Sequence, residues 1–248
     1  MSTSNELYYD FHMHSCLSPC GDNDMTPNNM AGMAALKELD AIALTDHNSC
    51  RNCGVFMKAA EKYGICAIPG MEVCTEEEIH VICLFPVLLA AEEFSRYIYE
   101  KTPNIKNNVE IYGHQYITDE NDQIIDEEPK LLVNACSVSV MKIPELVKLH
   151  NGVCFPAHID KKSYSILSVL GTIPEECGFK TAEISKPQMI ESLCEKHELL
   201  RRMNIMTNSD AHYLWDISER YYYLDNCTKK IENIIDKLNG GIQGGNRY

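Results

Sequence analysis

Two histidines, His12 and His14, stand at the end of the apolar run at 7–13, LYYDFHM. Because side chains alternate across a strand, residues two apart face the same side, so both imidazoles point the same way. Two imidazoles on one rigid strand make half of a site for a divalent ion. The spacing alone is a weak signal, since two polar residues at a strand end are an ordinary alternative.

The same arrangement recurs along the chain. Six of the nine histidines stand at or near the ends of predicted strands, a preference that scattered structural histidines would not show. Parallel strands all end on one side of a sheet, and active sites gather there. The sequence therefore predicts a metal cluster at that edge. The segments concerned are His12–His14, Asp46–His47, Gly70–Glu72, His80, His158–Asp160 and Ser209–His212.

Strands and helices alternate in the predicted order. We expect strands at 7–13, 40–45, 65–73, 79–85, 152–157, 179–185, 204–208 and 221–224. Helical patterns lie at 27–38, 51–63, 88–101, 139–150 and 228–239. This alternation favours a parallel sheet, either open or closed into a barrel. Without repeats or a low-complexity linker, one domain spanning 1–248 is the simplest organisation.

A polar segment near 112–130 interrupts this alternation. The stretch YITDENDQIID predicts an inserted β-hairpin, with Asn121 and Asp122 near its turn. We expect that such a hairpin could close over the mouth of the pocket and exclude long polymers.

Taken together, the motifs resemble the PHP (polymerase and histidinol phosphatase) family. The resemblance runs from residue 8 to about 213. It implies an α/β fold, a distorted (β/α)7 TIM-like barrel, and two or three divalent ions of manganese, iron or zinc. It also implies hydrolysis of phosphate esters. The motifs that carry it are His12-x-His14, Thr45-Asp46-His47, Gly70-Met71-Glu72, His80, Ala157-His158 and Ser209-Asp210-Ala211-His212.

The resemblance further implies three metal sites. The ligands of the first would be His12, His14, Glu72 and Asp210. Those of the second would be Glu72, His80 and His158, with Glu72 bridging the two ions. The third would use His47, His212 and one more carboxylate. By the same resemblance, Glu72, Asp210 and His212 are predicted to be catalytic.

The third site departs from the family pattern. Many relatives have an aspartate five residues after the second histidine of the first motif, and Pro19 occupies that position here. Asp22 and Asp24 follow shortly and could reach the site from a longer loop. We expect Asp22 to be the ligand, and without either carboxylate the third site would be weak or absent.

Other polar residues have two plausible roles each. Asp10, Asp46 and Glu183 could orient imidazoles as hydrogen-bond acceptors, or serve as solvated or capping carboxylates. Lys161 and Lys162 follow the His158 segment and could hold a substrate phosphate, or form an exposed pair. Four cysteines on the loops after His14 and His47 could bind a structural zinc or remain free thiols. These are Cys16, Cys20, Cys50 and Cys53.

Composition narrows the class of substrate. The net charge of −14 repels polyanions, which disfavours tight binding of long nucleic acid. No apolar run approaches the roughly 18 residues of a membrane span, and no export signal is visible, so we expect a cytoplasmic protein with reduced thiols.

We therefore expect a metal-activated hydroxide, at a cluster of two or three ions, to hydrolyse a small phosphorylated metabolite or short nucleotide. The alternatives are a histidinol-phosphate phosphatase, a short-oligonucleotide nuclease, a non-catalytic metal-binding protein, and a metallohydrolase acting on C–N bonds.

Overall fold

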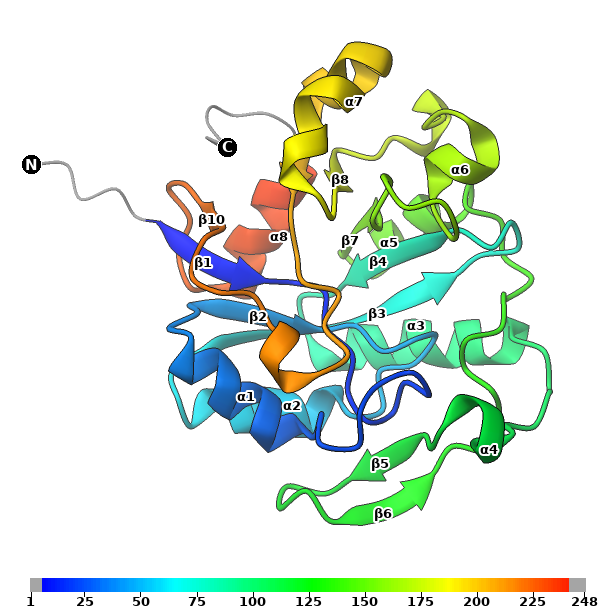
Figure 1. Ribbon diagram of the computed structural model, residues 1–248, viewed down its shortest axis with the longest axis vertical. Coiled ribbons are helices and arrows are strands. Elements are labelled where there is room, and N and C mark those ends of the chain that lie inside the picture. Colours follow the sequence, from blue (N-terminus) through cyan, green and yellow to red (C-terminus); the bar gives the residue numbers. More distant parts are fainter. Residues whose placement is uncertain (1–5, 241–248) are drawn as a thin grey trace, which may run out of the picture.

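The computed structural model describes residues 6–240, and one six-stranded sheet dominates it (Figure 1). Its strands lie close to the predicted ranges. In spatial order they are β10 (Tyr223–Leu224), β1 (Leu7–Asp10), β2 (Ala41–Leu44), β3 (Cys66–Cys74), β4 (His80–Leu84) and β7 (Val153–Pro156).

The strands of this sheet do not all run parallel, although the predicted alternation favoured a parallel sheet. Strands β1, β2 and β3 run parallel, whereas β4 runs antiparallel to both β3 and β7. His80, the first residue of β4, therefore pairs with Cys74, the last residue of β3. The reversed direction places His80 at the same edge as the ligand-type residues that follow the parallel strands.

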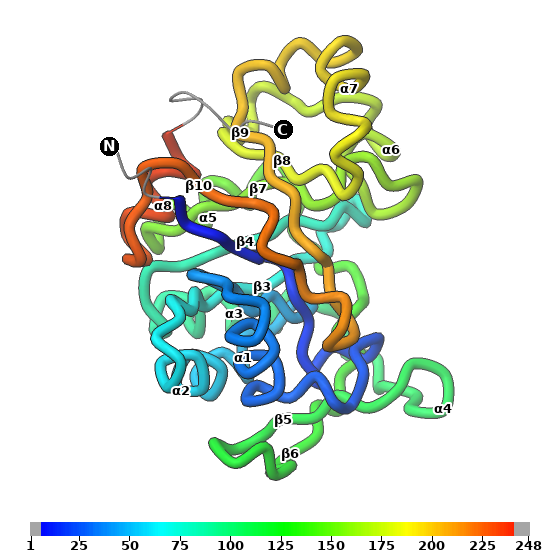
Figure 2. The backbone as a smooth tube through the Cα atoms, turned by 60° about the vertical axis from the view of Figure 1, so that its left-hand side comes forward, coloured from blue at the N-terminus to red at the C-terminus, as the bar shows by residue number. Residues whose placement is uncertain are grey.

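A second parallel pair, β8 (Thr181–Glu183) and β9 (Asn204–Met206), continues the curve of the sheet (Figure 2). The segment after β7 reaches it through Ile159, whose N–H donates to the carbonyl of Glu183 at 2.9 Å. The segment after β9 returns to the segment after β1, where His14 N–H donates to the carbonyl of Ala211 at 2.9 Å. The predicted α/β class is confirmed, and the sheet is a curled half-barrel.

Helices cover both faces of this sheet. The apolar cluster on one face includes residues of α1, α2, α3 and α5, and the cluster on the other face includes α8. Alternate side chains of β4 pack on opposite faces of the sheet, with Val81 and Cys83 in one cluster and Ile82 and Leu84 in the other. The five helices are α1 (Pro27–Leu36), α2 (Cys53–Glu61), α3 (Leu88–Lys101), α5 (Ile143–Leu149) and α8 (Ile231–Asn239), close to the predicted ranges.

Several short helices were not predicted, because four to seven residues are too few to show a helical period. They are α4 (Val109–Tyr112), α6 (Ile166–Leu170) and α7 (Ile190–Lys196), together with 3-10 turns at Glu175–Cys177, Pro187–Met189, Glu198–Arg202 and Leu214–Asp216. No helix within residues 6–240 combines the length and apolar character of a membrane span.

The predicted hairpin is present as β5 (Tyr116–Thr118) and β6 (Ile124–Glu127). At its tip, the carboxylate of Asp122 accepts hydrogen bonds from Thr26 Oγ1 at 2.6 Å and from Asn28 N–H at 3.2 Å. Thr26 itself makes no side-chain capping bond, so Asp122 caps α1 from a distance in sequence. The hairpin tip is bound to the start of α1 and does not reach over the ligand-type residues. The expectation that the hairpin closes over the mouth of the pocket is therefore corrected.

Candidate metal centre

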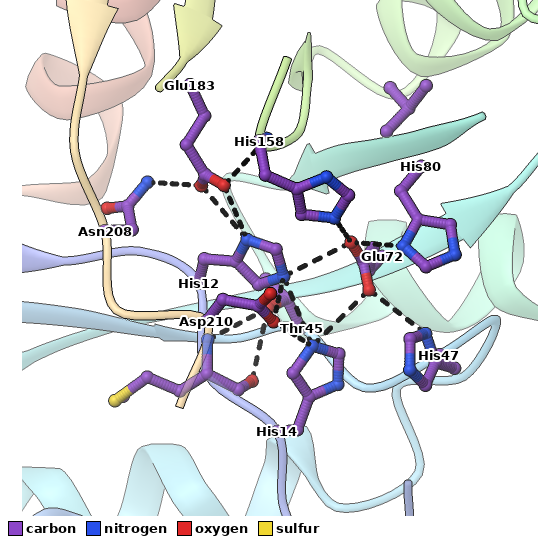
Figure 3. A network of polar contacts seen from close by, with 12 residues as sticks. His12, His14, Thr45, His47, Glu72, His80, His158, Glu183, Asn208 and Asp210 are labelled. Carbon is purple, nitrogen blue, oxygen red and sulfur yellow. Dashed lines mark hydrogen bonds and ion pairs between the residues drawn. The ribbon is translucent and has the colours of Figure 1, made fainter. Parts of the chain in front are cut away.

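Glu72, on β3, is a buried carboxylate surrounded by histidines (Figure 3). Five imidazole nitrogens lie between 2.8 and 3.4 Å from its two oxygens, and they come from four segments of the chain. The histidines are His12, His14, His47, His80 and His158.

This crowding suits shared cations better than hydrogen bonds. A carboxylate has about four lone-pair positions, and its single charge cannot balance five imidazolium ions. His47 Nδ1 and His80 Nδ1 are buried and make no hydrogen bond, although they lie 3.0 and 2.8 Å from Glu72 oxygens. Neutral imidazoles around cations would satisfy these nitrogens, so the donor set fits divalent ions.

The ligand-type atoms of the described residues form three overlapping groups. One contains His12, His14 and Asp210, in which the two Nε2 atoms lie 3.2 and 3.3 Å from Asp210 Oδ1. Another contains His47, Glu72 and His80. The last contains His14, His47 and His212.

The first group contains three of the four ligands expected for the first site, and the fourth, Glu72, lies 3.3 and 3.4 Å from the Nε2 atoms of His12 and His14. The second group has His47 beside Glu72 and His80, while the predicted member His158 places Nε2 3.2 Å from Glu72 Oε1. His47 therefore belongs to two of the groups, which the spacing of the motifs in the sequence did not indicate.

The structure does not bring Asp22 or Asp24 into the described groups. Asp22 Oδ1 instead accepts a hydrogen bond from Asp24 N–H at 2.8 Å, within an exposed turn. The side chain beside the two histidines expected in the third site is Cys20, whose Sγ lies 3.3 Å from His47 Nε2 and 3.1 Å from His212 Nε2. The place of Cys20 next to Pro19 in the sequence is the signal that could have indicated this position.

The other three cysteines of that group do not accompany Cys20. Cys16 Sγ donates to the carbonyl of Tyr116 at 3.8 Å, and Cys53 Sγ donates to the carbonyl of Gly70 at 3.4 Å. Cys50 is a buried thiol. No group of these four cysteines is among the possible metal sites of residues 6–240.

Outer hydrogen bonds fix which imidazole nitrogen faces the centre. Glu183 lies 3.0 and 3.1 Å from His12 Nδ1, so this nitrogen carries a proton and Nε2 is the nitrogen that faces the centre. Ser18 Oγ donates to Asp46 at 2.7 Å and therefore accepts from His14 Nδ1 at 3.0 Å. Glu183 thus has the predicted orienting role directly, and Asp46 has it through Ser18.

Asp10 has a different role from the one considered for it. Its carboxylate accepts from the backbone N–H groups of Ser209 at 3.1 Å and Ser218 at 2.9 Å, so it holds loops instead of an imidazole. In the Ser209–His212 segment, His212 Nδ1 donates to the carbonyl of Asp210 at 2.8 Å. The lone pair of His212 Nε2 then points toward Cys20.

Burial and neighbouring charges shift several pKa values in the cluster in opposite directions. Burial raises the pKa of Glu72, but the charges of His80 and His12 outweigh it and hold that pKa well below its usual range. Burial lowers the pKa of His12, but Glu183, Asp210 and Glu72 raise it well above 6.5. Desolvation raises the pKa of the Cys20 thiol, but hydrogen bonds with His212 and His47 bring it down to about 6.

Two ligand-type residues of the cluster have an unusual backbone conformation. His158 and Asp210 both adopt positive φ, at 29° and 53°, a region that residues other than glycine rarely occupy. Such strain persists where the surrounding structure enforces it, commonly at functional sites.

The two lysines after His158 have different surroundings. Lys161 Nζ forms an ion pair with Asp210 Oδ2, whereas Lys162 is exposed and makes no hydrogen bond or ion pair with the cluster within the described residues. The three remaining histidines lie elsewhere: His114 pairs with Glu127 on the hairpin at 2.8 Å, His150 lies 3.6 Å from Glu93, and His197 follows the last residue of α7.

Similar structures share this fold. The lesion-specific endonuclease PfuEndoQ from Pyrococcus furiosus matches with a TM-score of 0.71 and 18% identity, over 97% of this chain and 57% of the endonuclease. A complex of Endonuclease Q with a 27-mer duplex bearing an abasic lesion at the active site matches with a TM-score of 0.63, 17% identity and the same coverages. The chain thus spans a little over half the length of these enzymes.

A protein from Bifidobacterium adolescentis, proposed to be a metal-dependent phosphoesterase, is similar over nearly its whole length. The TM-score is 0.60 at 16% identity, over 95% of this chain and 96% of that protein. No curated protein is similar to the chain in sequence. The sequence model of the PHP domain matches residues 10–239, almost the entire chain. The chain therefore belongs to the PHP domain family, a family of metal-dependent phosphoesterases.

Proposed function

We propose that the protein hydrolyses phosphate esters of a small phosphorylated metabolite or short nucleotide, using two or three divalent ions held around Glu72. The observation that supports this most is the convergence of five imidazole nitrogens on one buried carboxylate. When bound, such ions lower the pKa of water toward neutrality and neutralise the charge of a phosphoryl group.

The residues of the chain supply position and polarity. His12, His14 and Asp210 would hold one ion, and His80 and His158 a second, with Glu72 between them. Glu183 keeps the lone pair of His12 Nε2 directed inward, because both its oxygens lie within 3.1 Å of Nδ1. Since these ligands are set before any ion binds, little reorganisation is needed on binding.

Lys161 would hold the substrate phosphate. Its Nζ pairs with Asp210 Oδ2 at the border of the cluster, and its side chain remains 43% exposed, so it can turn to an incoming anion. An ion bound at Asp210 would compete for that carboxylate and leave the ammonium group available. A charge-assisted contact of this kind contributes about 1.5–3 kcal/mol to binding.

The test is turnover by metal-loaded protein against a panel of phosphate monoesters, short oligonucleotides and amides. Hydrolysis of phosphate esters that requires added metal and is lost in Asp210→Ala supports the proposal. No turnover of any phosphate ester would leave a non-catalytic metal protein, and turnover of amides alone would indicate a C–N hydrolase.

A second candidate is a nuclease acting on damaged DNA. The likeness to Endonuclease Q, which was crystallised with a lesion-bearing duplex, supports its inclusion. Against it stand the net charge of −14 and the coverage of only 57% of that enzyme. A duplex oligonucleotide with an abasic site, added to the panel, distinguishes the two candidates.

A further inference from the structure

Cys20 lies between two histidines at one side of the cluster. Its Sγ is 3.1 Å from His212 Nε2 and 3.3 Å from His47 Nε2. Together with His14, these two histidines form the group of ligand-type atoms that lacks a carboxylate. Cys20 is also the one exposed cysteine among the described residues, so it can be reached from solvent.

The backbone, and not the thiol's own contacts, sets this position. A Cβ at Gly21 would lie 2.4 Å from the carbonyl oxygen of Ser15, so only glycine permits the tight turn that follows Cys20. Immediately after it, Asp22 N–H donates to the carbonyl of His212 at 2.9 Å. The cysteine loop and the His212 segment are thus joined directly beside the thiol.

The two imidazoles are prepared for a shared ligand. His212 Nδ1 donates to the carbonyl of Asp210, which leaves the Nε2 lone pair facing Cys20. In a tetrahedral zinc site, bond lengths near 2.05 Å to nitrogen and 2.3 Å to sulfur place those atoms about 3.6 Å apart. The separations of 3.1 and 3.3 Å require an outward shift of only a few tenths of an ångström to admit an ion.

We propose that Cys20 supplies the anionic ligand of a third ion, shared with His47 and His212, where relatives use a carboxylate. The inference rests on the proposed function, because it extends the same cluster. On binding, the thiol proton is released to solvent and sulfur bonds to the ion. A thiolate favours zinc over manganese or magnesium, so the third site of this protein would select a softer ion than an all-oxygen and imidazole site.

Cobalt(II) reports this ligand without any turnover. Metal-free full-length protein is titrated with cobalt, and the near-ultraviolet thiolate-to-cobalt charge-transfer band is recorded while bound metal is counted. We expect the band in the wild type and in the control Cys194→Ser, which changes a partly buried cysteine on α7. We expect Cys20→Ser to lose the band and one ion per chain, and Cys20→Asp to regain the ion without the band.

A measurement on the unaltered protein removes dependence on the folding of variants. Alkylation of Cys20, located by peptide mass spectrometry, should slow at least about tenfold when zinc occupies the site, since ligation removes the free thiolate. An unchanged alkylation rate, or a charge-transfer band that persists in Cys20→Ser, would overturn the proposal. Loss of phosphate-ester turnover with the band intact would instead count against the proposed function alone.

Discussion

Replacing Glu183 by glutamine tests whether hydrogen bonds outside the cluster control metal affinity. Glu183 accepts from three donors: His12 Nδ1 at 3.0 Å, His158 N–H at 2.9 Å and Asn208 Nδ2 at 2.7 Å. Glutamine keeps the shape but has one acceptor oxygen, and its amide N–H group must face a donor. At least one buried donor then lacks an acceptor.

The expected magnitude has two parts. A buried donor without a partner costs about 1–3 kcal/mol, so the free energy of unfolding of metal-free Glu183→Gln should be lower than that of the wild type by about that amount. Loss of the partner that orients a metal-ligating histidine typically weakens metal binding by about 10- to 100-fold, equivalent to about 1.4–2.8 kcal/mol.

The assay is competition with a fluorescent chelator, run beside thermal unfolding of the metal-free protein. Glu128→Gln is the matched control, because Glu128 is also buried and accepts from Tyr99 at 2.9 Å and Arg51 at 3.3 Å, away from the cluster. It should lower stability without changing metal affinity. Equal metal affinities for Glu183→Gln and wild type would refute the reasoning.

Four further changes have defined outcomes. Glu72→Gln should lower metal-dependent turnover by at least about 100-fold, because it removes the carboxylate between the ions; phosphate release measures it, and near-normal turnover would exclude a bridging role. Lys161→Ala should raise KM about 10- to 100-fold with little change in kcat, and an unchanged KM would remove Lys161 from the substrate site. Because the pKa of His12 in the metal-free protein is raised, an ion must displace a proton there, so the affinity for metal should rise as pH rises from 6 to 8. Calorimetry in buffers of different ionisation enthalpy should detect the released proton. Metal binding without proton release would contradict a protonated His12. Asp122→Ala should cost about 1 kcal/mol of unfolding free energy without altering turnover, since it removes the cap of α1; an unchanged denaturation midpoint would show that the hairpin tip contributes nothing.

Strand-end positions made most of the candidate site predictable from the sequence. His12, His14, Glu72 and Asp210 could be named as neighbours, because buried strands that alternate with helices end at a common edge. The hairpin turn at Asp122 was also predictable, because the residue types that favour a turn lie together in the sequence. These features depend on periodicity and short-range preference, which a single sequence carries.

Only the tertiary structure decided the contacts that depend on loop paths and strand direction. Strand β4 runs antiparallel, so His80 joins the cluster from the start of a strand, and hydrophobic periodicity contains no strand direction. The choice of Cys20 over Asp22 follows from a turn closed at Gly21 and a hydrogen bond to the His212 segment, about 190 residues away in sequence. That closure decides which side chain faces His47 and His212, whereas the family pattern favoured a carboxylate.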